Sequence, residues 1–348
     1  MIAQLADTIR TAAAQQRPLR VHGGNTKRFY GQAVEGEPLD VRAYGGVVDY
    51  EPSELVITVR AGTPLAEVER LLAEHHQMLA FEPPHYGAAA TIGGAVASGL
   101  SGPRRQAVGA VRDFVLGVRM LDGRGEDLSF GGRVMKNVAG YDVSRLMAGA
   151  LGTLGVLTEI SLKVLPQPQA EATLRFEMPE AVAIQNLNNW AARPLPISAS
   201  AWQDGELHLR LSGAQVAIDA ACARLGGERI DDAGYWQSVR DHTAPFFRAD
   251  GPLWRVSLPS VARPLELPGA QFIEWGGALR WLVTQADART VRAAAEARGG
   301  HATLFRGGDE ETPVFHPLPR AVLDIHRRLK AEFDPHGILN PGRMYRGL

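Results

Sequence analysis

Small residues dominate residues 83–109, and this stretch restricts the fold more than any other part of the chain. Its glycines stand at positions 87, 93, 94, 99, 102 and 109. With so few large apolar side chains, the stretch lacks the buried face of an amphipathic helix, and we expect no ordinary packed helix here. A second glycine segment, His22-Gly23-Gly24-Asn25-Thr26-Lys27, follows a short predicted strand at residues 18–21. Both segments indicate places where the backbone approaches another group closely.

Glycine loops of this kind are candidates for binding phosphate groups. Backbone N–H groups can converge on a phosphate only where side chains leave the approach open. The candidates are residues 22–27 and residues 90–99, although each loop alone is equally well explained as a glycine-rich turn. The dinucleotide fingerprint is absent, because Gly123-Arg124-Gly125 has Leu128 at the third glycine position and lies in a predicted hairpin. The chain also lacks a P-loop, a Gly-x-Ser-x-Gly elbow and a His-Glu-x-x-His helix, which argues against the hydrolases that use them.

The order of predicted elements indicates two domains, as the length of 348 residues also does. The first domain is expected to end at the break Pro166-Gln167-Pro168. Before this break we expect a strand at 55–60, a helix at 65–72 with Thr63 as N-cap and Pro64 at its first position, a hairpin over 114–130, a helix at 141–150 and a half-buried strand at 159–164. Residues 170–305 alternate short strands with helices, which is typical of an α+β domain with an antiparallel sheet covered on one face. The expected strands are 172–177, 197–202, 206–211, 253–258 and 279–284, and the expected helices are 180–190, 214–225 and 288–298. A last helix is expected over 322–333.

Composition excludes several classes of function. The formal net charge of −1 provides no positive excess for binding nucleic acid or an anionic membrane. The single cysteine, Cys222, cannot hold an iron–sulfur cluster, a multi-thiolate zinc site or a disulfide framework, and no metal site is predicted. The first ten residues do not resemble a signal peptide, and no window is apolar enough to span a membrane. We therefore expect a cytoplasmic protein without a membrane span of its own.

A series of motifs, in a fixed order along the chain, resembles the p-cresol methylhydroxylase type FAD-binding domain of the vanillyl-alcohol oxidase flavoprotein superfamily. The motifs are the glycine loop at 23–27, Pro52-Ser53-Glu54-Leu55-Val56 with Ala61-Gly62, Thr91-Ile92-Gly93-Gly94 continuing to Arg104-Arg105 and Arg112-Asp113, residues 136–142, and Gly152-Thr153-Leu154-Gly155-Val156-Leu157-Thr158. The tail at 337–343 resembles that of the D-lactate and glycolate oxidoreductases. The resemblance covers residues 18–168 and 333–344, roughly half the chain.

This resemblance implies an α+β fold: a p-cresol methylhydroxylase type FAD-binding domain at 1–168, an α+β cap domain at 169–315, and a C-terminal segment at 316–348 that returns to the first domain. It also implies FAD as cofactor. The expected cofactor-binding residues are Gly23, Gly24, Asn25, Thr26 and Lys27 in one loop, Thr91, Gly93, Gly94 and Ser98 in the opposite wall, Gly155 and Leu157 on the adenine side, and Lys136 and Asn340 toward the flavin ring. For Lys136 a solvated loop position is an equal alternative. Asp113, Tyr141 and Asp142 are expected to hold the fold through hydrogen bonds, and no catalytic residue is identified.

Departures from the resembled family refine its implications. Members that bind FAD covalently through this loop have histidine directly after the two glycines. This chain has Asn25 at that place, and its histidine, His22, stands before the glycines. The resemblance therefore implies non-covalent FAD. Leu151 stands where many D-lactate dehydrogenases have glutamate. The Gly-Asp-Gly-Asn-x-His metal and substrate segment of catalytic relatives is absent from residues 170–315.

The pattern thus resembles the FAD-binding subunits of glycolate oxidases, which are subunits of FAD-dependent oxidoreductases acting on 2-hydroxy acids. The implied partners are a larger flavin subunit and an iron–sulfur subunit, through which the chain would lie at the inner face of the membrane. Its flavin would relay electrons or stabilise the assembly. Two alternatives remain open at this point: a flavoenzyme similar to UDP-N-acetylenolpyruvoylglucosamine reductase, and an interaction subunit without flavin.

Overall fold

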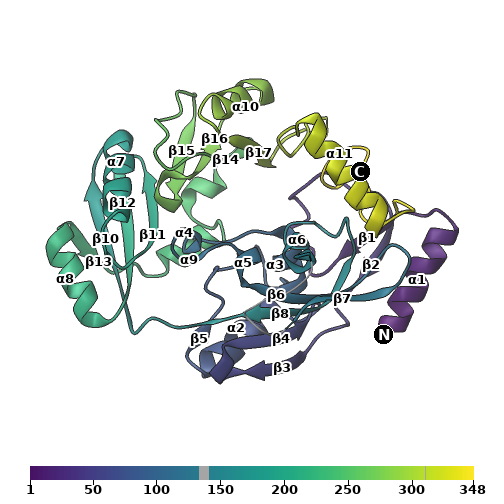
Figure 1. Ribbon diagram of the computed structural model, residues 1–348. Coiled ribbons are helices and arrows are strands. Elements are labelled where there is room, and N and C mark those ends of the chain that lie inside the picture. Colours follow the sequence, from purple (N-terminus) through teal and green to yellow (C-terminus); the bar gives the residue numbers. More distant parts are fainter. Residues whose placement is uncertain (133–140, 310) are drawn as a thin grey trace. The chain divides into compact units, whose positions relative to one another are not determined.

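A computed structural model describes residues 1–132, 141–309 and 311–348, which form two compact units (Figure 1). Unit 1 contains Met1–Leu100, Ala110–Pro166 and Pro317–Leu348. Unit 2 contains Ser101–Gly109 and Gln167–His316. The C-terminal segment therefore packs with the N-terminal half of the chain, whereas the short stretch from Ser101 to Gly109 belongs to the second unit.

Unit 1 is built mainly from short strands. Its helices are α1 (Ile2–Ala14), α2 (Leu65–Glu74), α3 (Ile92–Ser98), α5 (Val111–Phe114), α6 (Val143–Leu146) and α11 (Arg320–Phe333), with a 3-10 turn η1 at Pro52–Glu54. Its strands are β1 (Leu19–His22), β2 (Glu37–Asp40), β3 (Val47–Glu51), β4 (Val56–Arg60), β5 (Gln77–Met78), β6 (Val115–Leu121), β7 (Asp127–Gly131), β8 (Val156–Lys163) and β9 (Leu165–Pro166).

An antiparallel sheet in the order β3-β4-β8-β6-β7 forms the centre of unit 1. β8 lies in the middle and pairs with β4 and β6, so that Thr58 faces Ser161 across the strands. The sequence predicted a half-buried strand here, but Thr158 and Ser161 on β8 are buried as well as their apolar neighbours. The Ser161 hydroxyl can be buried because its oxygen is paired, with Ser161 Oγ 2.8 Å from Thr58 Oγ1.

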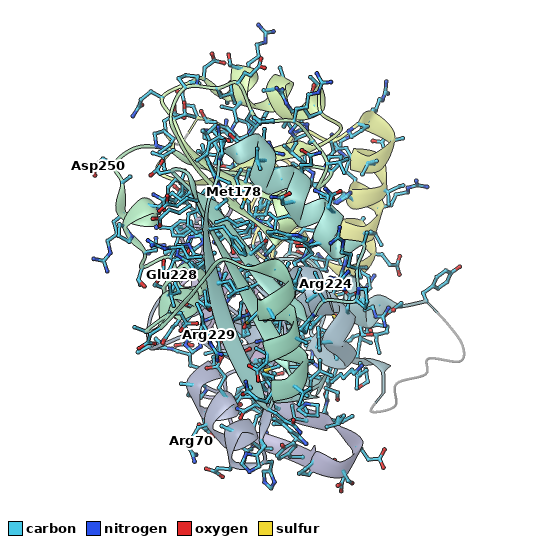
Figure 2. All side chains as sticks on the ribbon, turned by 90° about the vertical axis from the view of Figure 1, so that its left-hand side faces the viewer. Arg70, Met178, Arg224, Glu228, Arg229 and Asp250 are labelled. Atoms are coloured by element: carbon cyan, nitrogen blue, oxygen red, sulfur yellow. The ribbon has the colours of Figure 1, made fainter. Side chains whose placement is uncertain are left out.

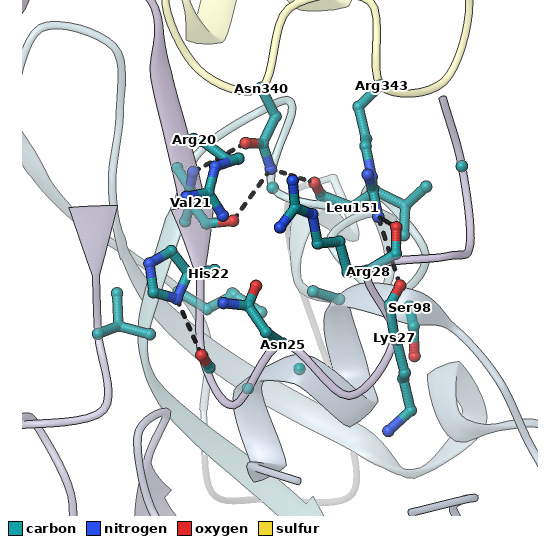
Figure 3. Close-up of a pocket in the computed structure, with 18 of the residues that line it drawn as sticks. Arg20, Val21, His22, Asn25, Lys27, Arg28, Ser98, Leu151, Asn340 and Arg343 are labelled. Carbon is teal, nitrogen blue, oxygen red and sulfur yellow. Dashed lines mark hydrogen bonds between the residues drawn. The ribbon is translucent and has the colours of Figure 1, made fainter. Parts of the chain in front are cut away.

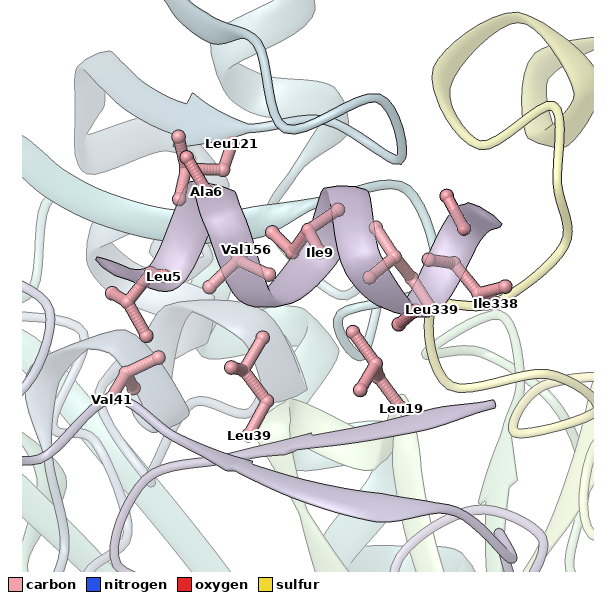
Figure 4. Close-up of a cluster of buried hydrophobic side chains, with 12 residues drawn as sticks. Leu5, Ala6, Ile9, Leu19, Leu39, Val41, Leu121, Val156, Ile338 and Leu339 are labelled. Carbon is pink, nitrogen blue, oxygen red and sulfur yellow. The ribbon is translucent and has the colours of Figure 1, made fainter. Parts of the chain in front are cut away.

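A second small core connects both ends of the chain. β1 and β2 pair in parallel, and α1 packs its Leu5 and Ile9 against Leu19 of β1, Leu39 of β2 and the C-terminal Leu339 (Figure 4). Leu19 N also donates a hydrogen bond of 2.7 Å to Ile338 O. The C-terminal tail is thereby held beside β1, immediately before the first glycine loop.

Three local expectations were wrong. Residues 92–98 form the short helix α3, because Thr91 caps it and small side chains let it pack closely. The helix expected over 141–150 is confined to α6. At α2 the N-cap is Pro64, while the Thr63 hydroxyl donates to Arg60 O and accepts from Gly46 N.

Unit 2 has one antiparallel sheet in the order β13-β10-β12-β11-β15-β16-β14-β17. The strands are β10 (Ala170–Glu177), β11 (Ile197–Gln203), β12 (Glu206–Gly213), β13 (Glu228–Ile230), β14 (Leu253–Ser257), β15 (Ala270–Glu274), β16 (Leu279–Val283) and β17 (His301–Arg306). The helices are α4 (Arg105–Val108), α7 (Glu180–Ala191), α8 (Gln215–Leu225), α9 (Tyr235–Arg240) and α10 (Ala288–Glu296), with 3-10 turns η2 (Pro245–Arg248) and η3 (Trp275–Gly277).

Two apolar clusters hold the helices of unit 2 on its sheet. Leu207, Leu209 and Leu211 of β12 pack with α7 and α8, whereas Trp254 and Leu282 pack with α10. Charged side chains remain outside these clusters, and Figure 2 shows Arg224, Glu228 and Arg229 around the turn between α8 and β13. The predicted antiparallel sheet of this region is therefore present, with β13, β15 and β17 in addition to the strands that the sequence indicated.

Within residues 1–132, 141–309 and 311–348, no helix has both the length and the apolar character that crossing a bilayer requires.

Candidate functional site

The first glycine loop follows β1 and lies against residues 87–91. A Cβ atom on Gly24 would stand 1.5 Å from Ala89 O, and one on Gly23 would stand 2.4 Å from Thr91 Oγ1. Neither position can accept a side chain without moving its neighbour. Asn25 has a φ of 57°, a left-handed conformation that asparagine adopts more readily than most residues. The loop is therefore shaped by close contact with the second glycine segment.

The second glycine segment forms the opposite wall. Thr91 Oγ1 accepts a hydrogen bond from Gly94 N and begins α3. A Cβ atom on Gly93 would meet Ala61 at 2.7 Å, so this glycine is required by packing. On Gly94 it would meet only Thr91 Oγ1, at 3.2 Å. Gly94 thus has space beside it, and this space belongs to the pocket.

The two segments enclose a pocket of about 330 Å³, within the range of small-molecule sites. Figure 3 shows the loop from His22 to Lys27 along one side of it. Twelve of the thirteen predicted cofactor-binding residues line this one pocket: Gly23, Gly24, Asn25, Thr26, Lys27, Thr91, Gly93, Gly94, Ser98, Gly155, Leu157 and Asn340. The thirteenth, Lys136, lies outside the described residues. That these residues bind a cofactor remains a prediction at this point.

The C-terminal tail closes the pocket beside β1. Asn340 accepts a hydrogen bond of 2.8 Å from Val21 N and donates one of 2.7 Å to Leu151 O. It has a φ of 41° and is buried. Gly152 has a φ of 70°, and a Cβ atom there would stand 2.8 Å from the Asn340 amide nitrogen. Asn340 therefore joins three separate parts of unit 1 at the pocket wall.

Positive charge collects around the pocket. Its lining contains Arg20, Lys27, Arg28 and Arg343, whereas no Asp or Glu is among the described residues that line it. Arg343 donates hydrogen bonds to backbone oxygens of Lys27, Arg28, Tyr30 and Gln32. Burial, and secondarily the charges of Arg28 and Arg20, lower the pKa of Arg343 to about 10. The arrangement favours an anionic ligand.

Sequence reasoning assigned no role to these arginines. Arg343 was part of the quoted C-terminal motif, and Arg20 and Arg28 flank the first glycine loop. The available signal was the position of basic residues on both sides of a candidate phosphate loop, because such residues meet the same ligand as the loop.

Of the three residues expected to hold the fold through hydrogen bonds, the two aspartates accept hydrogen bonds and the tyrosine side chain is exposed. Asp113 accepts a hydrogen bond of 2.8 Å from Ala110 N, and Asp142 accepts one of 3.2 Å from Arg145 N at the start of α6. Tyr141 is 96% exposed, so its ring does not pack into unit 1 and the expectation was wrong for its side chain.

Unit 2 offers aromatic packing around its histidines. His242 stacks on Phe247 with ring centroids 3.9 Å apart, and His208 stacks on Tyr235 at 4.4 Å. Burial lowers the pKa of both histidines, which favours the neutral imidazole. The part of the chain that the structure describes contains no group of three His, Cys, Asp or Glu residues able to hold a metal ion.

Comparison with known proteins supports a flavin site. Residues 1–131 match the family described as FAD binding domain. The chain is 50% identical to glycolate oxidase subunit GlcE of Escherichia coli, covering 98% of this chain and 96% of that protein. It is 24% identical to glycolate oxidase subunit GlcD of Bacillus subtilis, covering 86% of this chain and 77% of that protein.

A solved structure gives the same fold. The crystal structure of p-cresol methylhydroxylase with substrate bound has a TM-score of 0.70 to this chain at 14% identity, covering 99% of this chain and 87% of that one. This neighbour and the matched FAD binding domain confirm the expected fold class, an α+β protein of p-cresol methylhydroxylase type.

Proposed function

Because this chain belongs to the family of glycolate oxidase subunit GlcE, we propose that it is the FAD-binding subunit of a glycolate oxidase complex, an oxidoreductase acting on a 2-hydroxy acid. The observation that carries the proposal is the 50% identity to GlcE over nearly the whole of both proteins. It is far more specific than the fold, which many flavoenzymes share.

The pocket of unit 1 is the place where FAD would bind. The backbone of the first glycine segment borders the pocket, and the lining carries basic side chains, whereas the N–H groups of Gly93 and Gly94 already donate to Ala61 O and Thr91 Oγ1. Gly23, Gly24, Asn25 and Thr26 would hold the phosphates, Thr91, Gly93, Gly94 and Ser98 the opposite side, and Gly155 and Leu157 the adenine. When bound, FAD supplies a group able to accept and pass on electrons. This chain's own residues bind it, orient it and limit the access of water.

We propose further that FAD is bound without a covalent bond. Asn25, which stands where histidine carries flavin in covalent members of the superfamily, ends in an amide that is a poor nucleophile. His22 Nδ1 lies 2.9 Å from Gly23 O, within the loop itself. The test is to purify the tagged chain, record its absorption spectrum and precipitate it with acid. Free FAD in the supernatant is expected; flavin that stays with the precipitate would contradict this part alone, and a colourless chain without affinity for FAD would contradict the flavin assignment.

The name GlcD of a second relative supports a complex of several subunits. We propose that this chain assembles with a larger flavin subunit and an iron–sulfur subunit at the inner face of the membrane, and that its FAD relays electrons or stabilises the assembly. Its single cysteine requires that any cluster be held by another chain. Purification of the tagged chain from its own cells, followed by identification of bound subunits and determination of iron, tests the assembly. Recovery of the chain without a flavoprotein or iron–sulfur partner would contradict it.

A further inference from the structure

We propose that Arg20 and Arg28 form a cationic pair that binds the pyrophosphate of the flavin dinucleotide; this inference rests on the proposed binding of FAD in the same pocket. Both side chains line the pocket. They flank the first glycine loop in the sequence, since Arg20 lies on β1 before it and Arg28 directly follows Lys27.

The other basic groups of the pocket are already engaged. Lys27 Nζ donates to His85 O over 3.3 Å, and His22 Nδ1 lies 4.0 Å from Asp40. Arg343 donates to four backbone oxygens. By contrast, across the described residues of the chain neither Arg20 nor Arg28 has a hydrogen bond or an ion pair from its guanidinium group. Arg20 and Arg28 are therefore the pocket-lining cations whose guanidinium groups are available to bind a ligand.

The arrangement is unfavourable unless an anion joins it. Arg20 and Arg28 each act electrostatically on Arg343 and lower its pKa, so both positive charges lie within range of Arg343. No carboxylate among the described pocket-lining residues offsets them. Two phosphate groups carry the negative charge that such a cluster lacks, and phosphate oxygens accept charge-assisted hydrogen bonds from cationic side chains. The pyrophosphate is the part of FAD that carries full negative charge.

The C-terminal tail fixes the backbone of both arginines. Asn340 binds the backbone of Val21, next to Arg20, and Arg343 binds the backbone oxygen of Arg28 (Figure 3). Figure 3 shows the Arg20 and Arg28 side chains among those that line the pocket. The backbone of both arginines is thus fixed before a ligand arrives, and less ordering of the loop is left for the binding step.

A series of charge variants tests the pair. We would prepare Arg20→Lys, Arg20→Met and Arg20→Glu, and the same three changes at Arg28, remove the flavin, and titrate each full-length apoprotein with FAD at low and high salt. Relative to the unchanged chain, we expect FAD affinity to fall no more than threefold for Lys, about tenfold for Met and further for Glu. The differences should shrink at high salt.

The matched control is the same series at Arg70, which lies on the exposed side of α2 in an ion pair with Glu74 (Figure 2). Its variants should bind FAD as the unchanged chain does. Equal FAD affinity across the Arg20 and Arg28 series would overturn the pair and leave FAD binding intact. Loss of affinity in the Lys variants as large as in the Met variants would also overturn it, because shape rather than charge would then matter. If the unchanged chain binds no FAD, the proposed function fails together with the inference.

Discussion

At the scale of single residues, the pocket depends on positions where the absence of a side chain matters. Gly23, Gly24 and Gly93 are required by neighbouring atoms, so substitution there would damage the fold and the site together. Gly94 differs, because the space beside it belongs to the pocket rather than to the core. It separates an effect on ligand binding from an effect on folding better than the other three glycines.

We therefore predict that Gly94→Val abolishes retention of FAD while leaving most of the stability of the chain. The β-branched side chain would extend from α3 into the space that the pyrophosphate needs. The measurement is the ratio of flavin absorbance to protein absorbance after gel filtration, together with thermal unfolding. Gly45→Val is the control, since a Cβ atom there meets its neighbours only at 3.5 Å or more, whereas Gly226 has a φ of 68° that strains any side chain. Equal flavin content in the two variants would show that the pyrophosphate passes elsewhere.

Much of the candidate site could be predicted because glycine, threonine and asparagine have position-specific meaning in loops. The motif order located Thr91, Gly94 and Asn340, and the structure brings them to one pocket. Arg20 and Arg28 could not be recognised, because an isolated arginine has the same sequence signal in a pocket as on the surface. The folded chain distinguishes them, because within its described residues Lys27 and Arg343 form hydrogen bonds and the guanidinium groups of Arg20 and Arg28 do not.

At the scale of elements, the sequence predicted those parts whose pattern is set locally. The β6–β7 hairpin, the strands β10, β11 and β12, and α7, α8 and α11 have clear periodicity and clear breaks. α3 was missed because its burial relies on small residues that approach β4 and β8, which no local pattern records. The burial of Thr158 and Ser161 on β8 likewise depends on the central place of this strand in the sheet, between β4 and β6.

The end of α11 supports a prediction about stability. Buried Lys330 donates 2.7 Å hydrogen bonds to Thr153 O, Leu339 O and Asp334 Oδ2, and Asp334 accepts from Leu339 N. Lys330→Met would leave the buried Asp334 carboxylate without its cation, at a cost of about 3–5 kcal/mol. Denaturant unfolding measures this.

The control on the same helix is Arg327→Met. Arg327 pairs with Asp324 at the surface, where both side chains are about half exposed, and the expected cost is below about 1 kcal/mol. Similar losses in the two variants would mean that the Lys330 network contributes no more than a surface pair.

The aromatic cluster around His242, which joins the segment after α9 to η2, β16 and β17, supports a prediction about pH. Burial lowers the pKa of His242 well below 6.5, and the charges of Arg306 and Arg255 add to this. Below pH 6.5 the unfolded chain takes up a proton that the folded chain does not, so the free energy of unfolding falls as the pH falls. The slope from this group approaches about 1.4 kcal/mol per pH unit.

His242→Asn should flatten this slope between pH 6.5 and 5, because asparagine accepts the φ of 53° at this position and does not titrate. At pH 7 the variant should be less stable, since the ring stacked on Phe247 is lost. The matched substitution is His76→Asn, at an exposed residue with a φ of 54°. Urea unfolding followed by tryptophan fluorescence at several pH values gives the slope, and an unchanged slope in His242→Asn would place the acid sensitivity elsewhere.

At the scale of the whole molecule, this chain combines a nearly complete binding pocket with no identified catalytic apparatus. Oxidation of a 2-hydroxy acid needs a base for the hydroxyl proton, a clamp for the carboxylate and an acceptor for the hydride. The proposed FAD site in unit 1 would supply only the acceptor. The histidines His208 and His242 of unit 2 are packed against aromatic rings, and burial favours their neutral forms.

We predict that the isolated chain, loaded with FAD and supplied with an artificial electron acceptor, does not oxidise glycolate or D-lactate. Residues 170–315 lack the metal and substrate segment of the catalytic D-lactate dehydrogenases that this chain resembles, and a single cysteine cannot hold a cluster to pass electrons onward. Turnover should appear only when partner subunits are added. The measurement compares the chain, the partners and the reconstituted complex under identical conditions, with reduction of the acceptor as readout. Substantial turnover by the chain alone would contradict the accessory role and direct the search for a base to His208, His242, His301, His316 and His326.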